Sequence, residues 1–331
     1  MLKRKLGRTD LELTPVGLGT WAIGGGAWKF GWGSQNNADA ISGILRGIEL
    51  GINWIDTARV YGDGQSEKLV GEALRKLGRH RPLIATKCSR KVLSDGSVTG
   101  QLDAKSVKAE CEESLRRLGI DTIDLYQMHW PEPDEQIEEG WGAMAELFEE
   151  GKVRHIGVSN FDVSQMERLN AIHPIASLQP PYNMLDRRAE NDLFDYCVAH
   201  DIGIVCYSPM ARGLLSGAMT TERALHLEST DHRRREPMFQ SPQIEEHLSL
   251  VQSLRAIAER NNRSVAELAI AWVLRRDEVT SAIVGTRSGR QIEGTVAAGN
   301  WELTRDDIDE IERLLAEHAE KMARICGSSI S

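Results

Sequence analysis

The stretch INWIDTARVYGDGQSE, residues 52–67, has the form of a strand, a loop and the start of a helix. An apolar run ends at Asp56, the loop that follows carries Tyr61, and a helical pattern begins near Ser66. The same form recurs around LIATK at residues 83–87 and DLYQMHW at residues 124–130. A strand followed by a helix is the repeating unit of α/β folds, so this stretch indicates an α/β protein.

The rest of the chain repeats this unit. Eight short segments are rich in apolar or β-branched residues, and between them lie longer segments whose apolar residues recur at helical spacing. The expected strands are Val16–Gly19, Asn53–Asp56, Leu83–Lys87, Ile123–His129, Val153–Val158, Ile175–Gln179, Ile202–Cys206 and Ser281–Val284. The expected helices include Ala38–Leu50, Ser66–Leu77, Ala104–Leu118, Ile137–Glu150, Arg187–His200 and Val265–Arg275. Glycines suited to ending a helix follow several of them, at Gly51, Gly78, Gly119 and Gly151.

This alternation indicates a parallel sheet, because parallel neighbours need a crossover helix. An open doubly wound sheet and a closed (β/α)8 TIM barrel both satisfy it, and the count of eight favours the barrel. No linker divides the chain, so residues 1–331 are expected to form a single barrel domain. Three segments depart from the repeat. They predict an N-terminal β-hairpin at Lys3–Thr14, a long polar loop at Ser208–Ser241 and an extra C-terminal helix at Arg305–Ala323.

Composition narrows the classes of function. The chain has 40 basic and 49 acidic side chains, a formal net charge of −9, so its average surface repels nucleic acid and anionic membranes. The longest apolar run, Leu268–Leu274, is too short to span a bilayer, and the N-terminus lacks the apolar run of a secretion signal. Five cysteines without a CxxC pair argue against disulfides and structural zinc. We therefore expect a cytoplasmic monomer or dimer without a metal.

Several common signatures are absent from the sequence. It contains no GxGxxG after the first strand, no GxxxxGK[ST], no GxSxG and no HExxH. If the protein uses a dinucleotide, it does not hold it in a Rossmann crevice. A hydrolase that pairs a histidine with a serine is a distant alternative, since no nucleophile elbow is present.

Ionisable side chains stand at the ends of consecutive expected strands. Asp56, Lys87 and His129 each follow an apolar run, and Tyr61 lies five residues beyond Asp56. In a barrel these strand ends share one face, which is the face that carries active sites. Each residue alone has an ordinary structural explanation, as a turn cap, a surface ion pair, a rim aromatic or a core histidine. Their joint occurrence favours a functional site.

Together these four side chains form a proton-donating site. A tyrosine near its ordinary pKa of about 10 is a weak acid at neutral pH. A lysine ammonium nearby is expected to stabilise the phenolate and lower that pKa, while an aspartate holds the lysine charged. A histidine beside the tyrosine can orient a substrate carbonyl by a hydrogen bond.

The same segments resemble a known family. INWIDTARVYGDGQSE, LIATK, DLYQMHWPEP, IGVSNF (156–161) and AIVGTRSGRQ (282–291) are similar to the aldo-keto reductase superfamily, over essentially the whole chain. The motifs GLGTWAIGG, LQPPYNM, ARGLLSG and PMFQSP are most similar to the bacterial branch that includes general stress protein 69 of Bacillus. The resemblance implies a (β/α)8 barrel, in agreement with the eight expected strands. It also implies that Asp56, Tyr61, Lys87 and His129 form a catalytic tetrad, with Tyr61 as general acid in reduction and general base in oxidation.

The resemblance further implies a nicotinamide dinucleotide bound extended across the barrel mouth. Ser159, Asn160 and Gln179 match the positions that bind the carboxamide, and Tyr207 matches the aromatic that stacks on the nicotinamide ring. The residues alone also allow Ser159 and Asn160 to cap a helix before Val163. Residues that match the rest of the cofactor site are Gly19, Thr20 and Trp21 near the nicotinamide, Ser208, Pro209, Arg212, Gly213, Leu214 and Ser216 over the pyrophosphate, and Gly285, Thr286, Arg287 and Gln291 after the eighth strand.

These positions favour NADP(H), and NAD(H) stays possible. Arg287 suits a charge-assisted contact to a 2′-phosphate. Gly294 and Thr295 replace a Glu-Asn pair that many family members use toward adenine and ribose, which puts adenine-side contacts in doubt. The run Arg233–Arg235 is either a second phosphate clamp or a solvated loop face.

The expected function is NADPH-dependent reduction of an aldehyde or ketone, a small-molecule carbonyl substrate. One alternative is an NAD(P)-dependent sugar or polyol dehydrogenase that works in the oxidative direction. A second is a cofactor-binding regulatory module that resembles channel β-subunits. Four tryptophans are expected at the pocket rim, Trp21, Trp28, Trp32 and Trp130. Their rings can stack on sugars, aromatic aldehydes and bulky ketones alike, so they do not rank these substrates.

Overall fold

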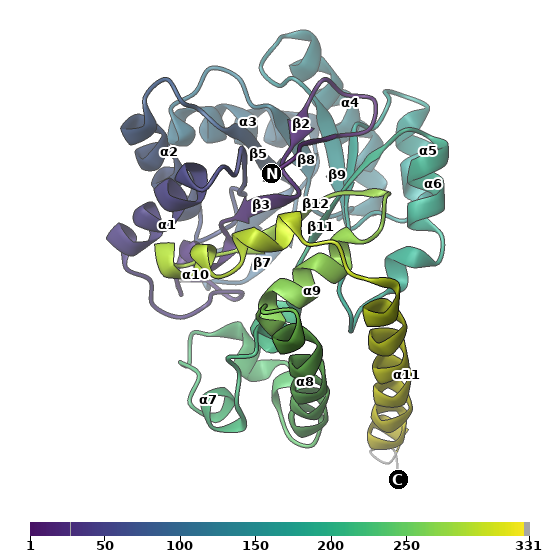
Figure 1. Cartoon of the computed structure of the whole chain (residues 1–331). Coiled ribbons are helices and arrows are strands. Elements are labelled where there is room, and N and C mark those ends of the chain that lie inside the picture. The colour runs from purple at the N-terminus through teal and green to yellow at the C-terminus, as the bar shows by residue number, and fades with distance from the viewer. Residues whose placement is uncertain (27, 328–331) are drawn as a thin grey trace.

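Eight parallel strands close into a barrel within residues 1–26 and 28–327, the residues that the computed structural model describes (Figure 1). Each strand pairs with the next along the chain, and the last pairs with the first. This confirms the (β/α)8 TIM barrel over the open doubly wound sheet. The strands are β3 (Val16–Gly19), β4 (Trp54–Asp56), β5 (Leu83–Cys88), β8 (Leu125–Met128), β9 (Ile156–Ser159), β10 (Ser177–Gln179), β11 (Gly203–Tyr207) and β12 (Val279–Gly285).

The strands are apolar because both of their faces are buried, one by the barrel interior and one by the helices. Inside the barrel, the Trp54 indole packs against β3 so closely that a Cβ on Gly17 would lie 2.1 Å from the ring. The indole N–H donates to the Ser281 hydroxyl at 3.1 Å. The barrel is thus a filled core, which confines any ligand to its ends.

The helices begin where the sequence offers a cap. The Asn36 side chain accepts from two backbone N–H groups of α1, and Ser264 and Glu267 form a capping box at α9. The helices are α1 (Asn37–Glu49), α2 (Gln65–Leu77), α3 (Ala104–Leu118), α4 (Ile137–Glu149), α5 (Val163–Asn170), α6 (Leu193–Ala199), α7 (Thr221–Leu225), α8 (Gln243–Arg260), α9 (Val265–Leu274), α10 (Gly289–Glu293) and α11 (Arg305–Gly327).

One predicted helix was wrong in its extent. The pattern at Arg187–His200 predicts a single helix, whereas the structure has a 3-10 turn at Arg188–Glu190 and then α6. Asp192, with φ of −150°, interrupts the helical backbone between them. Periodicity of apolar residues cannot locate a break of one residue.

The N-terminal hairpin is confirmed and closes one end of the barrel. It consists of β1 (Arg4–Lys5) and β2 (Glu12–Leu13), which pair antiparallel. Its leucines pack with Trp54 in one buried cluster, and the hairpin lies at the top of Figure 1. The opposite end, toward α7 and α8 at the bottom of the view, is the end at which the carboxyl ends of the strands open. A functional site therefore has one end of the barrel available.

Three features at that end were not predicted. A second hairpin, β6 (Arg90–Val92) with β7 (Val98–Gly100), follows β5. The long segment Ser208–Ser241 is not a plain loop, because it contains α7 and 3-10 turns at Ala211–Ser216, His232–Arg235 and Pro237–Phe239. The third feature is helix α8, which follows this segment. The C-terminal helix α11, which was predicted, packs along α8, and Glu246 of α8 forms an ion pair with Lys321 of α11.

None of the helices in the described part of the chain is both long and apolar enough to cross a bilayer. Within the same residues, no group of three or more potential ligands is placed to hold a metal ion.

Candidate active site

The four predicted ionisable residues come together at the open end of the barrel. Asp56 ends β4, Lys87 is the penultimate residue of β5 and His129 directly follows β8. Tyr61 lies in the loop after β4, with its phenol oxygen 3.3 Å from the Lys87 ammonium. The parallel barrel makes this possible, because it places the carboxyl ends of neighbouring strands side by side.

Lys87 and Asp56 form a buried ion pair. The Lys87 ammonium donates to both carboxylate oxygens at 2.8 Å and to the carbonyl of Thr57 at 3.0 Å. The Gln179 amide donates a third hydrogen bond to the Asp56 carboxylate, at 2.9 Å. Burial lowers the pKa of Lys87, and the charge of Asp56 opposes that effect. The paired carboxylate therefore fixes the ammonium in position beside Tyr61.

Tyr61 sits at the junction of the ion pair and an aromatic cluster. Its ring lies 5.1 Å from the Lys87 ammonium and 6.1 Å from the centre of Trp28. Burial, followed by the negative charge of Asp56, raises the pKa of Tyr61 well above 10. The predicted lowering of this pKa was therefore wrong, because burial has the largest effect and the charge of Asp56 adds to it.

His129 faces Tyr61 edge to face, with ring centres 5.6 Å apart. Its Nδ1 is buried and has no hydrogen-bond partner within the described residues. Burial, with the positive charges of Lys87 and Arg90, lowers the pKa of His129 well below 6.5. The ring is therefore neutral at physiological pH and has one N–H to donate toward a ligand beside the tyrosine.

Ser159, Asn160 and Gln179 lie together at the ends of β9 and β10, as predicted. The Asn160 amide donates to the carbonyl of His129 at 2.9 Å and accepts from the Tyr207 phenol at 2.8 Å. Asn160 holds a left-handed backbone, with φ of 64°. The alternative role as a helix cap is not realised, because Asp162 caps α5. These amides thus line the site and connect it to Tyr207.

A cavity of about 780 Å³ lies at this open end of the barrel and is lined by these residues. Its volume falls in the roughly 300–1,000 Å³ range of small-molecule sites. Leu214, Thr286 and Lys87 do not line it, since their side chains are buried beneath its surface. The predicted residues that line it are Asp56, Tyr61, His129, Gly19, Thr20, Trp21, Ser159, Asn160, Gln179, Tyr207, Ser208, Pro209, Arg212, Gly213, Ser216, Gly285, Arg287 and Gln291.

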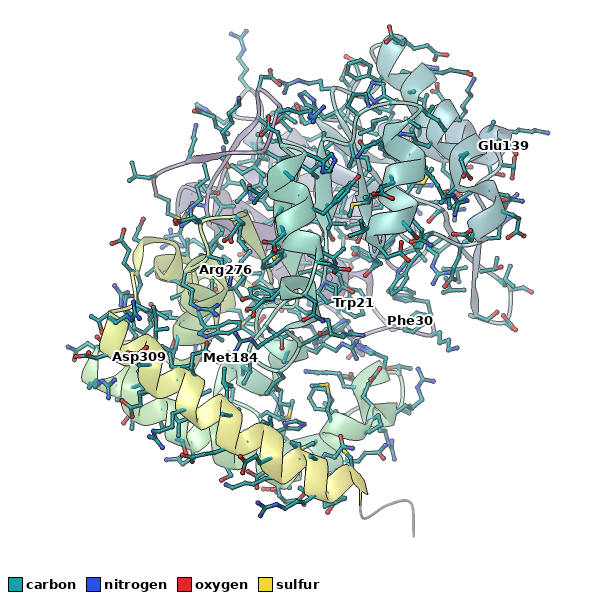
Figure 2. The ribbon with its side chains drawn as sticks, turned by 90° about the vertical axis from the view of Figure 1, so that its right-hand side faces the viewer. Trp21, Phe30, Glu139, Met184, Arg276 and Asp309 are labelled. Carbon is teal, nitrogen blue, oxygen red and sulfur yellow. The ribbon has the colours of Figure 1, made fainter. Side chains whose placement is uncertain are left out.

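The tetrad end of the cavity is aromatic. The predicted rim is confirmed, since Trp21, Trp28, Trp32 and Trp130 all line the cavity. Figure 2 shows Trp21 near Phe30, between the barrel and the segment after β11. Hairpin β6–β7, which was missed, contributes Arg90 and Val98. Its turn residues Asp95-Gly96 were the available sequence signal for a hairpin.

The other end is basic and formed by loops. Arg212, Arg223, Arg287 and Arg290 line it, together with Gly294. The Arg287 guanidinium donates to the Gln35 side chain at 2.7 Å and to the carbonyls of Trp32 and Ser34. These partners are neutral oxygen atoms, so the positive charge of Arg287 is available to an anion.

The segment after β11 lies across the open end of the barrel and contacts the loop that follows β3. Ser208, Ala211 and Arg212 have left-handed backbones, with φ between 45° and 55°. His232 donates its backbone N–H to the carbonyl of Gly31 at 2.9 Å. The Glu228 carboxylate accepts from the backbone N–H of Ser34 at 2.8 Å. We call the contacts between residues 29–35 and 228–235 the mouth latch.

In the arginine run at residues 233–235, Arg233 fits neither of the two predicted roles, whereas the exposed Arg234 agrees with a solvated loop face. Arg233 is buried, forms a two-point ion pair with Asp231 at 2.6 and 3.0 Å, and lies 4.4 Å over the Trp32 ring. Arg234 is exposed, and Arg235 donates to the carbonyl of Lys29. Arg233 thus stabilises the mouth latch with its charge already paired, so it does not act as a free phosphate clamp.

The cavity has the chemistry that a nicotinamide dinucleotide requires. Amide groups and the Tyr207 ring stand beside the tetrad. The Gln179 amide nitrogen donates to Asp56 and Gln127, and within the described residues its side-chain oxygen accepts no hydrogen bond. The opposite end supplies cations and a turn with small residues, where backbone N–H groups can approach phosphate oxygens. Ser159, Asn160, Gln179 and Tyr207 would hold the nicotinamide, and Arg287 and Arg290 would face the phosphates. Arg212 lines the same end of the cavity but forms an ion pair with Glu236 at 2.9 Å.

Comparisons with known proteins agree over nearly the whole chain. A profile described as "Aldo/keto reductase family" matches residues 15–316. The chain is 38% identical to aldo-keto reductase YhdN of Bacillus subtilis, over 93% of this chain and 91% of that protein. It is 34% identical to the NADH-specific methylglyoxal reductase of Escherichia coli, over 98% of this chain and 100% of that protein. The solved glycerol dehydrogenase AKR11B4 from Gluconobacter oxydans is similar, with a TM-score of 0.85, 34% identity, and coverage of 96% and 95% of the two chains.

Proposed function

Because the chain belongs to the aldo/keto reductase family, we propose that it is an NADPH-dependent reductase of aldehydes or ketones in which Tyr61 transfers the proton. The chain is an oxidoreductase of carbonyl and alcohol groups, and it takes a nicotinamide cofactor. The observation that carries the proposal is the Tyr61 phenol, which lies 3.3 Å from a lysine ammonium inside a cavity. A nicotinamide cofactor, when bound, supplies or accepts the hydride.

Each residue of the tetrad then has one task. Tyr61 gives its proton to the carbonyl oxygen in reduction and removes it from the alcohol in oxidation. Lys87 lies beside the phenol oxygen and stabilises the charge that develops there as the proton leaves. Asp56 holds the ammonium, and its pair with Lys87 keeps two buried charges compensated.

His129 orients the substrate. Its neutral ring stands edge to face with Tyr61, so its N–H and the phenol O–H can meet one carbonyl oxygen. The aromatic walls exclude water from this point, which strengthens both hydrogen bonds. Trp28 packs against Tyr61 with ring centres 6.1 Å apart and lines the cavity beside it, so a carbonyl compound that reaches Tyr61 also contacts this indole.

The basic end of the cavity supports NADPH over NADH. Arg287 is half-buried, and burial, followed by the charge of Arg233, lowers its pKa, so an added anion relieves an unfavourable charge. Arg290 is exposed at the same end. A relative of 34% identity is named as NADH-specific, so the preference needs a direct measurement.

Oxidation of an alcohol is the second candidate for the physiological direction, and it is favoured by the similarity to a named glycerol dehydrogenase. Both directions pass through the same transition state and use the same residues. Rates with NADP⁺ and NADPH at cellular ratios would separate them.

The proposal is tested by titrating the protein with NADPH and NADH under fluorescence, then adding aromatic aldehydes, methylglyoxal, sugars and ketones. We expect tighter binding of NADPH, turnover of some carbonyl, and a loss of roughly 10²- to 10⁴-fold in kcat for Tyr61→Phe with cofactor affinity unchanged. Near wild-type turnover by a folded Tyr61→Phe protein would overturn the role of Tyr61.

A further inference from the structure

Ser89, the residue after β5, joins the ends of two strands that carry tetrad residues. It is fully buried and has a left-handed backbone, with φ of 81°. Its hydroxyl exchanges hydrogen bonds of 3.2 Å with the backbone N–H and carbonyl of Trp130. The neighbouring Cys88 carbonyl accepts from the backbone N–H of His129, also at 3.2 Å. Lys87 and His129 are therefore linked through the turn at Ser89.

This turn also starts hairpin β6–β7. The Ser89 carbonyl accepts from the backbone N–H of Gln101 at 3.0 Å, which closes the hairpin at its base. The hairpin contributes Arg90 and Val98 to the cavity wall. The backbone of Ser89 thus decides where one wall of the substrate space stands as well as where His129 stands.

A non-Gly residue in a left-handed conformation needs surrounding contacts to hold it. The contact that holds Ser89 comes from Glu110, a residue of α3 that is only 6% exposed. The Glu110 carboxylate accepts from the backbone N–H of Ser89 at 3.0 Å. A buried carboxylate is costly unless it serves as a hydrogen-bond acceptor or a charge partner, and the mechanism proposed above leaves this one without a task.

We propose that Glu110 is a positioning residue for carbonyl reduction, acting through Ser89 on His129 and on hairpin β6–β7. The inference rests on the proposed function for its catalytic consequence, and on the described contacts for its structural one. Without the carboxylate, the Ser89 N–H loses its acceptor and the turn can relax out of the left-handed region. His129 then loses its alignment with Tyr61, although no residue that touches the cofactor has changed.

The first test compares Glu110→Ala with Glu110→Gln at saturating cofactor and substrate. The glutamine keeps an acceptor oxygen for Ser89, whereas the alanine removes it. We expect Glu110→Ala to lower kcat by roughly 10- to 100-fold, since misplacement of a reacting group by about 1 Å costs on that order. We expect Glu110→Gln to retain kcat within about threefold, and both variants to bind NADPH as the wild type does.

A matched control separates positioning from stability. Cys111→Ala empties a fully buried site next to Glu110 on α3 and leaves the Ser89 contact intact. It should reduce stability in urea and leave kcat of the folded protein unchanged. The double variant Glu110→Ala/Ser89→Gly should lose no more in kcat than the worse single variant, because both changes interrupt the same chain of contacts from Glu110 through Ser89 to His129.

Side-chain NMR gives a readout that does not depend on turnover. The ¹⁵N resonances of the His129 ring, assigned with His129→Gln, should move in Glu110→Ala and stay in place in Glu110→Gln. If the wild type reduces no carbonyl, the proposed function fails while this readout still decides whether Glu110 positions His129. Unmoved His129 resonances, or an unchanged kcat in Glu110→Ala, would overturn the inference.

Discussion

The two ends of the cavity are built in different ways. At the tetrad end, Asp56 and Lys87 stand on barrel strands and are buried, and Lys87 donates two hydrogen bonds of 2.8 Å to the Asp56 carboxylate and one of 3.0 Å to the carbonyl of Thr57. At the basic end, Arg287 stands after β12 and is held by loop carbonyls, and the mouth latch joins two segments outside the barrel through backbone and side-chain contacts. The barrel fixes the first set, whereas contacts between loops fix the second.

This difference separates chemistry from cofactor selection. A change at the tetrad end disturbs buried charges, so it should affect folding and proton transfer together. A change at the basic end alters exposed or half-buried groups, so it should affect binding with little effect on the barrel. Substitutions at the two ends should therefore differ in which property they change, stability and proton transfer at the tetrad end or cofactor binding at the basic end.

Lys87→Met should have the largest effect. It leaves the Asp56 carboxylate buried without its cation, which costs roughly 3–5 kcal/mol of folding free energy, and it removes the charge beside Tyr61. Urea unfolding followed by circular dichroism measures the stability. The control Asp56→Asn/Lys87→Met removes both charges and should recover part of the stability but not the activity. A loss below about 1 kcal/mol in Lys87→Met would contradict a buried pair.

Arg287→Ala should weaken NADPH binding by roughly 10- to 100-fold and leave NADH binding nearly unchanged, because a charge-assisted hydrogen bond contributes about 1.5–3 kcal/mol. The free energy of unfolding should change much less than in Lys87→Met. Fluorescence titration with both cofactors measures the effect, and Arg234→Ala, an exposed arginine that does not line the cavity, is the control. Equal losses for both cofactors would show that Arg287 orders the loops and does not select the 2′-phosphate.

The rate of reduction should be nearly independent of pH between about 6.5 and 9, a range that lies between the ordinary pKa values of histidine, about 6.5, and tyrosine, about 10. His129 stays neutral there, because its pKa lies well below 6.5, and Tyr61 stays protonated, because its pKa lies well above 10. Oxidation should accelerate with rising pH, since it needs the phenolate. If the wild-type reduction rate already falls as the pH rises toward 9, and Lys87→Arg shows no such fall, then Lys87 lowers the pKa at which Tyr61 loses its proton.

Acidification should also reduce stability through His129. Its pKa is depressed in the fold, so the unfolded chain binds the extra proton first, and stability falls as pH drops below about 6.5. His129→Gln should show a shallower fall in urea midpoint between pH 7 and pH 5. Identical slopes for the two proteins would exclude His129 as a source of this dependence.

Glu228→Gln should have the smallest effect. Its carboxylate accepts from the backbone N–H and the hydroxyl of Ser34 at the exposed surface of the mouth latch, where water can replace either contact. The urea midpoint should stay nearly unchanged, and stopped-flow fluorescence should show faster NADPH release with an unchanged reduction rate at saturation. A change in the rate of the chemical step would mean that the two ends of the cavity are coupled.

Much of the tetrad end was predictable from the sequence, because strands that end in Asp56, Lys87 and His129 must bring those residues to one face of a barrel. The contacts at the basic end were less predictable from the sequence. Arg233 lies in an arginine run that gives no sign of its pairing with Asp231, and Arg287 gives no sign that it donates to residues 32–35. Arg287 and residues 32–35 are far apart in the chain, whereas Asp231 is two positions from Arg233, and the periodicity of apolar residues carries no information about either contact.

The amino-acid sequence was sufficient to predict the alternation of strands and helices and the groups at the strand ends, because both follow from apolar spacing within about 20 residues. Its eight units favoured a closed barrel, and the strand pairing in the structure established the closure. The direction of the pKa shift of Tyr61 emerged from the folded structure. Burial and the charge of Asp56 raise this pKa, whereas the sequence predicted that Lys87 would lower it. Such effects depend on the summed distances to charges from several strands and on the loss of water around them, and neither quantity exists before the chain has folded.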